Sequence, residues 1–128
     1  MKFTPDKPIY RQIIDYAFAA IQSGKWKPGD KIPSVRELAA QMDVNAHTVL
    51  KAYDYLTAHG IISVKRGMGY FLSDKALHKV NAERCEYFFD HTLQEMFRQM
   101  TLLDIDISDV IQQYYAYRNR LLKQKLKK

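Results

Sequence analysis

The sequence predicts a mainly α-helical chain with a small β-hairpin, arranged as a winged helix-turn-helix followed by a two-helix arm. Three observations predict this class. Two short amphipathic patterns flank a tight turn, two β-rich runs then flank a glycine-rich tip, and apolar residues recur at helical spacing in the remainder. We expect the winged helix-turn-helix over residues 1–74 and the arm over residues 75–128.

The first predicted helix covers residues 9–23, where apolar residues recur every three or four positions. Pro8 precedes it, at a place where a missing N–H costs little, and Gly24 is placed to end it. The segment 26–30 predicts a turn, because Pro28 fixes one corner and Gly29 can adopt the left-handed conformation of the next.

The next two helices form the helix-turn-helix. Ser34 and Glu37 have the spacing of a capping box, in which each side chain bonds the backbone of the other. Asp43 tolerates the left-handed backbone of a tight turn, and Asn45 is placed to cap the second helix. Gly60 ends that helix. Its inward stripe comprises Val49, Ala52, Tyr53 and Leu56.

Residues 61–65 and 70–73 predict two strands, and the tip between them, Arg66-Gly67-Met68-Gly69, predicts a hairpin. Beyond it, apolar residues spaced by gaps of three and four predict two further helices. Asp106 is placed to cap the last one. The two stripes comprise Phe89, Leu93, Met96, Met100 and Leu103 in one helix, and Val110, Tyr114, Tyr117 and Leu121 in the other.

Charge is unevenly distributed along this chain, whose formal net charge is +6. Residues 1–73 carry 10 Lys/Arg against 6 Asp/Glu, whereas residues 74–119 carry 5 against 8. The first segment therefore suits a polyanion such as DNA, which the second would repel. The five cations of the tail (Arg120, Lys123, Lys125, Lys127, Lys128) either contact DNA loosely or offset the dipole of a solvated helix end, and we expect the second.

Several other classes of protein are disfavoured. Cys85 is the single cysteine and the start of the chain lacks the apolar stretch of a signal peptide, so we expect a cytoplasmic protein. No nucleotide-binding loop, nucleophile elbow or metal-ligand pair is present, and His78 and His91 are too far apart to form a helical ligand pair. We predict that the protein is not an enzyme and that it binds no cofactor, metal or membrane. The sequence does not decide whether it binds a small-molecule effector.

The start of the second helix of the helix-turn-helix carries polar side chains suited to DNA. Asn45 and His47 can donate to or accept from base edges, Thr48 can meet a phosphate or a thymine methyl, and Lys51 supplies charge to phosphate. Each has a plainer interpretation as well. Asn45 is equally suited to be only a cap, and Thr48 to be a solvated helix residue.

The order of motifs closely resembles the DNA-binding domain of GntR-type regulators over residues 8–72. The resemblance implies that Arg36 contacts DNA, that Asn45, Ala46, His47, Thr48 and Lys51 face it, and that Arg66, Gly67 and Gly69 form a wing tip that enters the minor groove. Many relatives have Arg in place of Ala46, so a different operator sequence is expected. The motifs are Pro8-Ile9-Tyr10-Arg11-Gln12-Ile13, Gly24-x-Trp26-x-Pro28-Gly29-Asp30-x-Ile32-Pro33-Ser34-x-Arg36-x-Leu38-Ala39, Val44 to Val49, Ala52-Tyr53-x-x-Leu56 with Gly60, and Gly67-x-Gly69-x-Phe71.

The short arm is similar to that of the YtrA-like subgroup of this family, in which it serves dimerisation. A two-helix hairpin cannot cover all its own aromatic residues, and a twofold partner would cover them and match a palindromic operator. We therefore expect a homodimeric regulator, and the family resemblance alone implies that it is a repressor. The alternative to a dimer is that these aromatic residues pack on the chain's own first domain. The alternative to a sequence-specific regulator is an architectural or protein-docking winged helix that does not select a DNA sequence.

Overall fold

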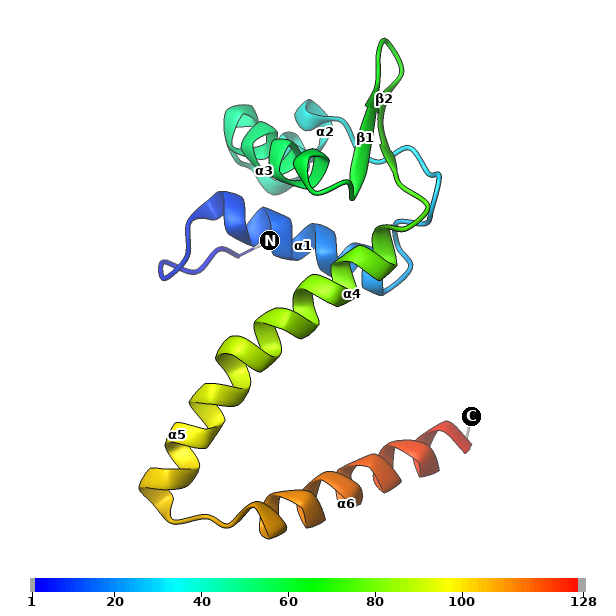
Figure 1. Cartoon of the computed structure of the whole chain (residues 1–128). Helices are drawn as coiled ribbons and strands as arrows, with labels where there is room; N and C mark the ends of the chain where they lie inside the picture. Colours follow the sequence, from blue (N-terminus) through cyan, green and yellow to red (C-terminus); the bar gives the residue numbers. More distant parts are fainter. Residues whose placement is uncertain (1, 127–128) are drawn as a thin grey trace. The chain divides into compact units, whose positions relative to one another are not determined.

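The computed structural model describes residues 2–126, which form six α-helices, one π-helical turn and a two-stranded antiparallel sheet (Figure 1). They fall into two compact units, the first ending at Cys85 and the second beginning at Glu86. The predicted class, a mostly helical chain with a small hairpin in a winged helix-turn-helix, is confirmed. The first unit contains helices α1 (Ile9–Gln22), α2 (Val35–Met42) and α3 (Ala46–Ala58).

These three helices surround one hydrophobic core, in which α3 packs against both α1 and α2. The predicted inward stripe of α3 is buried, with Val49, Ala52, Tyr53 and Leu56 all fully inaccessible to solvent. Burying apolar surface is the main force that holds such helices, because short helices are marginal on their own. The core also includes Ile13, Ile14, Ala17, Trp26, Ile32, Leu38, Ile61 and Leu72.

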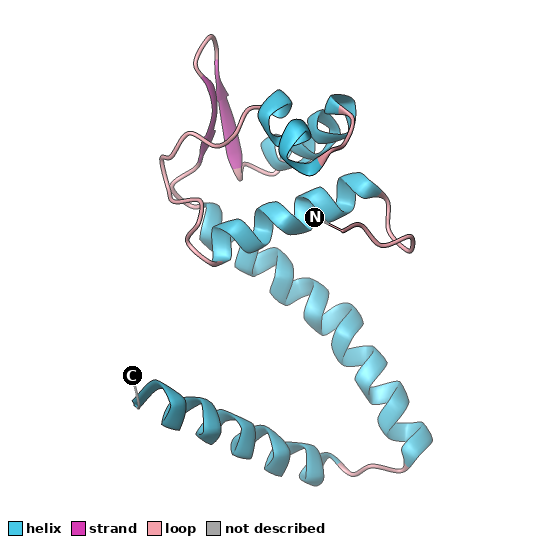
Figure 2. Ribbon diagram, turned by 180° about the vertical axis from the view of Figure 1, so that it is seen from behind, coloured by secondary structure: helices cyan, strands magenta, loops and turns pink. Residues whose placement is uncertain are grey.

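Strands β1 (Ile62–Lys65) and β2 (Gly69–Leu72) form the predicted hairpin, which projects from the helices of the first unit (Figure 2). Their register pairs Ile62 with Leu72 and Lys65 with Gly69.

Residues 30–32, before α2, pair with β2 through a single β-bridge that the sequence did not predict, and this segment is referred to as the third strand of the wing. The Ile32 amide donates to the Tyr70 carbonyl at 3.0 Å, and the Leu72 amide donates to the Asp30 carbonyl at 2.9 Å. Lys31 and Phe71 are thereby bridge partners. The predicted turn over 26–30 consequently continues into backbone pairing along the free side of β2.

Residues before α1 are fastened to it by Gln12, the buried polar side chain of the first unit. Its amide nitrogen donates to the carbonyls of Thr4 and Lys7 at 2.8 and 2.9 Å, and its oxygen accepts from the Thr4 amide at 2.9 Å. The side-chain amide therefore satisfies backbone groups that would otherwise be left without partners near the core.

Helix α4 (Ala76–Tyr87) begins inside the first unit. Ala76 and Val80 are fully buried, Gln22 donates to the Asn81 side chain at 2.9 Å, and the Tyr55 hydroxyl donates to Glu83. Compact packing thus extends past residue 74, where we expected the first domain to end. The division of function at that residue stays a prediction.

The second unit contains a π-helical turn η1 (Phe88–Thr92), α5 (Leu93–Leu103) and α6 (Ile107–Leu126). The predicted cap is confirmed, because an Asp106 carboxylate oxygen accepts from the Ser108 amide at 3.1 Å. Over residues 86–126 no side chain is fully buried. The two C-terminal cations of the predicted tail, Lys127 and Lys128, lie outside the described residues.

Candidate nucleic-acid interface

The start of α2 and the turn between α2 and α3 are held by local features of four residues, Ser34, Glu37, Asp43 and Asn45. The capping box at the start of α2 is formed as predicted, because the Ser34 hydroxyl accepts from the Glu37 amide and the Glu37 carboxylate accepts from the Ser34 amide, both at 3.1 Å. Asp43 ends α2 in the left-handed conformation, with φ of 54°. Asn45 then caps α3. The turn is therefore fixed by the residues predicted for it.

The carboxylate of Glu37 is stabilised by its place in the capping box at the start of α2. Hydrogen bonds from the Ser34 backbone and then from the Ser34 side chain lower the pKa of Glu37 from 4.5, and the charge of Lys31 adds to the effect. The ionised form is the one that accepts the Ser34 amide. A negative charge in the first turn also suits the positive end of the helix dipole.

Helix α3 presents its polar N-terminal end to solvent. Asn45, Ala46, His47 and Lys51 are exposed, and Thr48 is half-buried. The structure thus brings these five predicted residues together on one accessible end of a helix whose opposite stripe is in the core. This is the geometry that a recognition helix needs to insert its first residues into a major groove.

Two of these residues are already engaged within the chain. The Asn45 side-chain oxygen accepts from the His47 amide at 2.8 Å, which leaves the NH₂ group as its available donor. The Lys51 ammonium lies 4.0 Å from the ring centroid of Tyr10 on α1. This cation–π contact holds the charge near the surface of the helix pair, and nothing in the sequence spacing pointed to it.

Arg36 and the wing tip carry the other predicted contacts. Arg36 is exposed in the first turn of α2, and Arg66 and Gly67 are exposed at the tip of the hairpin. A Cβ atom placed on Gly67, whose φ is +75°, would meet no atom within 4 Å. The tip is thus open to close approach by a partner backbone.

Gly69 has a different reason for being glycine. Its φ is +110°, and a Cβ atom there would lie 3.0 Å from Cε of Lys31. The end of the Lys31 side chain therefore lies in the space beside Gly69, and the contact of Gly69 with DNA stays a prediction. Lys31 was not among the predicted site residues, because its nearness to the wing depends on the unpredicted third strand.

The cations of this surface are not neutralised by neighbouring acids. Over residues 2–126 the ion pairs are Lys7–Asp15 and Arg98–Glu95, neither of which involves α2, α3 or the wing. A surface with several unpaired cations attracts a polyanion. The same part of the chain contains no group of three His, Cys, Asp or Glu residues able to hold a metal ion.

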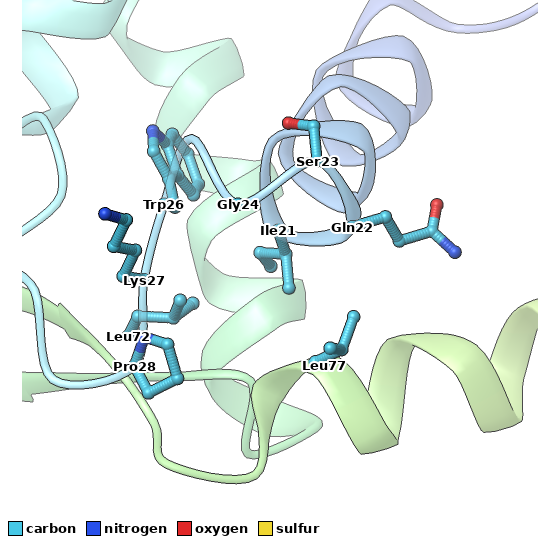
Figure 3. Close-up of a pocket in the computed structure, with 9 residues that line it drawn as sticks. All are labelled: Ile21, Gln22, Ser23, Gly24, Trp26, Lys27, Pro28, Leu72 and Leu77. Carbon is cyan, nitrogen blue, oxygen red and sulfur yellow. The ribbon is translucent and has the colours of Figure 1, made fainter. Parts of the chain in front are cut away.

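A shallow pocket is found in each unit. The pocket in the first unit, of about 230 Å³, lies where the end of α1, the following turn, β2 and the start of α4 meet (Figure 3). It is smaller than the pockets of about 300–1,000 Å³ that hold drug-sized ligands. Its lining is mainly apolar and comprises Ile21, Gln22, Ser23, Gly24, Trp26, Lys27, Pro28, Leu72 and Leu77.

The second unit has an apolar groove of about 360 Å³ between α6 and the η1–α5 segment. Some of the large apolar side chains that line it stay accessible, among them Phe88 at 47% and Ile111 at 48%. The stripes predicted from helical spacing are therefore only partly covered within the described part of this unit. The groove is lined by Phe88, Thr92, Leu93, Met96, Val110, Ile111, Tyr114 and Tyr115. None of the helices in residues 2–126 is both long and apolar enough to cross a membrane.

Comparison with known proteins places this chain in a family. The family model described as bacterial regulatory proteins, gntR family, matches residues 9–72. The chain is 43% identical over 75 residues to the HTH-type transcriptional regulator YhcF of Bacillus subtilis (strain 168), covering 59% of this chain and 62% of that protein. It is 49% identical over 69 residues to the HTH-type transcriptional repressor YtrA of the same organism, covering 54% and 53%. The matches thus span less than two thirds of these relatives.

Solved structures resemble more of the chain. A putative regulator of the GntR family from Bacteroides thetaiotaomicron has a TM-score of 0.77 at 35% identity, covering 89% of this chain and 99% of that one. A GntR family regulator from Listeria monocytogenes has a TM-score of 0.76 at 31% identity, covering 89% and 98%. The DNA-binding domain of AraR in complex with operator ORX1 has a TM-score of 0.52 at 31% identity, covering 57% and 93%.

Proposed function

Because the chain belongs to the gntR family of bacterial regulatory proteins, we propose that it binds one palindromic operator as a homodimer and represses transcription there. That it is a transcription regulator with a GntR DNA-binding domain follows from the family and its relatives. The proposal concerns how this particular chain selects its DNA and assembles on it. Its site of action would be the cytoplasm, where bacterial operators lie.

The observation that carries the proposal is the exposed polar end of α3. Asn45, His47 and Thr48 offer donors and acceptors, while the buried stripe of the same helix fixes their direction. Side chains held in this way can match the distinct pattern of each base pair in the major groove. Ala46 adds no hydrogen bond and can contact only apolar atoms such as a thymine methyl.

Charged residues around this helix end would position it without selecting sequence. Arg36 and Lys51 flank it from α2 and from the next turn of α3, and Arg66 extends from the wing tip. A guanidinium suits the narrow, strongly negative minor groove, and Gly67 lets the tip approach closely. We assign Arg36 and Lys51 to phosphates, Arg66 and Gly67 to the minor groove, and Gly69 to the shape of the tip.

The homodimer is supported by the apolar surface of the second unit. A groove lined by apolar and aromatic residues costs free energy when exposed to water, so a partner that covers it is favoured. A second copy of this chain would supply a matching surface through a twofold axis. Two recognition helices related by that axis would then meet the two halves of a palindrome.

Selection from random DNA by the purified full chain tests the proposal. We expect one enriched palindrome, bound at least about 10³-fold more tightly than bulk DNA. Sedimentation of the free protein should give the mass of two chains. An absence of any preferred sequence would contradict operator recognition and favour the architectural alternative. Repression is tested separately by transcription from a promoter that contains the selected palindrome, where added protein should lower the transcript yield.

A further inference from the structure

One face of the wing carries cations that the proposed recognition surface does not use. In an antiparallel sheet, paired residues point to the same side, as do alternate residues of one strand. Phe71 pairs with Ser63 in β1 and with Lys31 in the third strand, while Lys65 pairs with Gly69. Lys31, Ser63, Lys65 and Phe71 therefore share one side of the sheet, which we call the wing face.

The wing face is turned away from the core of the first unit. The opposite side of the sheet carries Ile32, Ile62 and Leu72, which are buried. Tyr70 lies on that side as well, with its ring 4.9 Å from the ring of Tyr53 in α3. Lys31, Ser63 and Lys65 are exposed on the outer side.

Both lysines of the wing face extend over β2 from the strands on its two sides. The Lys65 ammonium lies 4.5 Å from the ring centroid of Phe71. The Lys31 side chain passes over Gly69, with its Nζ 3.7 Å from the place where a Cβ would stand. Two ammonium groups held over the same strand repel each other, and an anion bound against them would reduce that repulsion.

No acidic side chain supplies that anion. Glu37 is near enough for the charge of Lys31 to lower its pKa, but its carboxylate accepts the Ser34 amide in the capping box. The ion pairs found in residues 2–126 lie elsewhere. The two cations are therefore available to an external anion, with the Lys65 side chain held over the Phe71 ring and the Lys31 side chain over Gly69.

We propose that the wing face binds phosphates of the operator backbone outside the base pairs that α3 contacts, through Lys31 and Lys65 with the Ser63 hydroxyl beside them. This inference rests on the proposed function. DNA is the occupant that the surroundings favour, because the face is continuous with two parts already assigned to DNA. Lys65 adjoins Arg66 of the wing tip, and Lys31 lies close to the first turn of α2, which carries Arg36.

The test compares the full-length parent with the double variant Lys31→Gln/Lys65→Gln. Affinity for the selected palindrome is measured over a salt series. Each phosphate contact contributes about 0.9 to the slope of log K against log salt, and the homodimer carries both lysines twice, so the variant should lose about 3.6. Its order of preference among related sequences should not change. The matched control is Lys2→Gln/Lys75→Gln, which removes the same charge from exposed positions outside the wing face. Its salt slope should be closer to the parent's than the slope of the wing-face variant is.

A second measurement locates the contacts. Trimming the base pairs that flank the palindrome should weaken binding by the parent and leave binding by the wing-face variant unchanged. Thermal unfolding of both double variants should match the parent, since the exchanged side chains are exposed.

The outcomes separate this inference from the proposed function. If the parent has no preferred sequence, the proposed function fails and the wing face has no operator to bind. If the parent prefers one sequence but the wing-face variant keeps the parent's salt slope and its sensitivity to trimming, only the wing-face inference is overturned. Binding of an acidic protein by the parent, lost in that variant, would then identify the other class of partner for these lysines.

Discussion

The hydroxyl of Tyr53 donates a 2.6 Å hydrogen bond to the carbonyl of Pro33, across twenty residues of sequence. Tyr53 belongs to α3, and Pro33 immediately precedes the capping box of α2. The edge of the same ring packs on Tyr70 of β2. One fully buried side chain thus connects the proposed recognition helix with the start of α2 and with the wing, so the three parts of the surface keep their mutual positions.

Tyr53→Phe should therefore destabilise the first unit. It removes the hydrogen bond and leaves the Pro33 carbonyl without this donor, which costs about 1–3 kcal/mol. Urea unfolding of the full chain measures the loss. Tyr16→Phe is the control, because the Tyr16 hydroxyl accepts only from the exposed ammonium of Lys25 and its removal should cost less than about 0.5 kcal/mol. Equal stability of the Tyr53 variant and the parent would show that this hydrogen bond does not stabilise the first unit.

The capping box should make stability depend on pH through Glu37. Its folded pKa is lowered below 4.5 by the Ser34 hydrogen bonds, so its contribution is fully present above the unfolded pKa and is lost as pH falls through the folded value. Glu37→Gln should remove this part of the acid dependence. We expect the melting temperatures of parent and variant to converge as pH falls below about 4, and a constant difference from pH 7 to pH 3 would contradict the assignment.

Ser34→Ala removes the other half of the same motif. The Ser34 hydroxyl accepts from the Glu37 amide, and loss of such a helix cap costs about 1 kcal/mol. Urea unfolding measures this cost at neutral pH, where the Glu37 carboxylate is ionised. A variant as stable as the parent would mean that water replaces the hydroxyl without loss.

Arg36→Ala and Lys51→Ala should each weaken binding to all DNA sequences and reduce the salt slope by about 2, because both residues are assigned to phosphates and each occurs twice in the homodimer. His47→Ala should instead change the order of preferred sequences, with a discrimination of about 1–3 kcal/mol lost at one base pair. Anisotropy titrations over a panel of related duplexes measure both effects. Operator binding as tight as the parent's by the Arg36 and Lys51 variants would show that the DNA-facing side was wrongly assigned.

Ile111→Glu should dissociate the proposed dimer, because it puts a charge into the apolar groove of the second unit. Sedimentation should change from two chains to one. Gln112→Glu, at the adjacent exposed position, is the matched control and should leave the dimer intact. A dimeric Ile111 variant would mean that subunits associate through another surface.

The elements around the recognition turn could be predicted because their signals are local. The capping box, the left-handed residue Asp43 and the cap Asn45 each depend on interactions over three residues or fewer, and the helical stripe of α3 follows from its own spacing. The structure confirms all of these. The exposed positions of Asn45, His47 and Lys51 follow from the same periodicity.

The third strand of the wing could not be predicted in this way. Residues 30–32 form too short a run to show alternation, and their partner β2 is about forty residues further along the chain. Because this pairing was not predicted, the position of Lys31 beside the wing was not predicted either. Nor was the crowding of Gly69 by the Lys31 side chain. The contact between Lys51 and Tyr10 was missed for the same reason, since it joins two helices that are distant in sequence.

Pairing of β2 on both sides also affects how the molecule behaves at high concentration. A projecting hairpin with unpaired backbone invites strands of other molecules to add to it and start an aggregate. Here, within residues 2–126, the segment before α2 occupies one flank, and the remaining flank belongs to the four-residue strand β1, which ends in a lysine. A short edge strand that ends in a charged residue is a poor template for the addition of further strands, so the wing can extend into solvent without seeding fibrils.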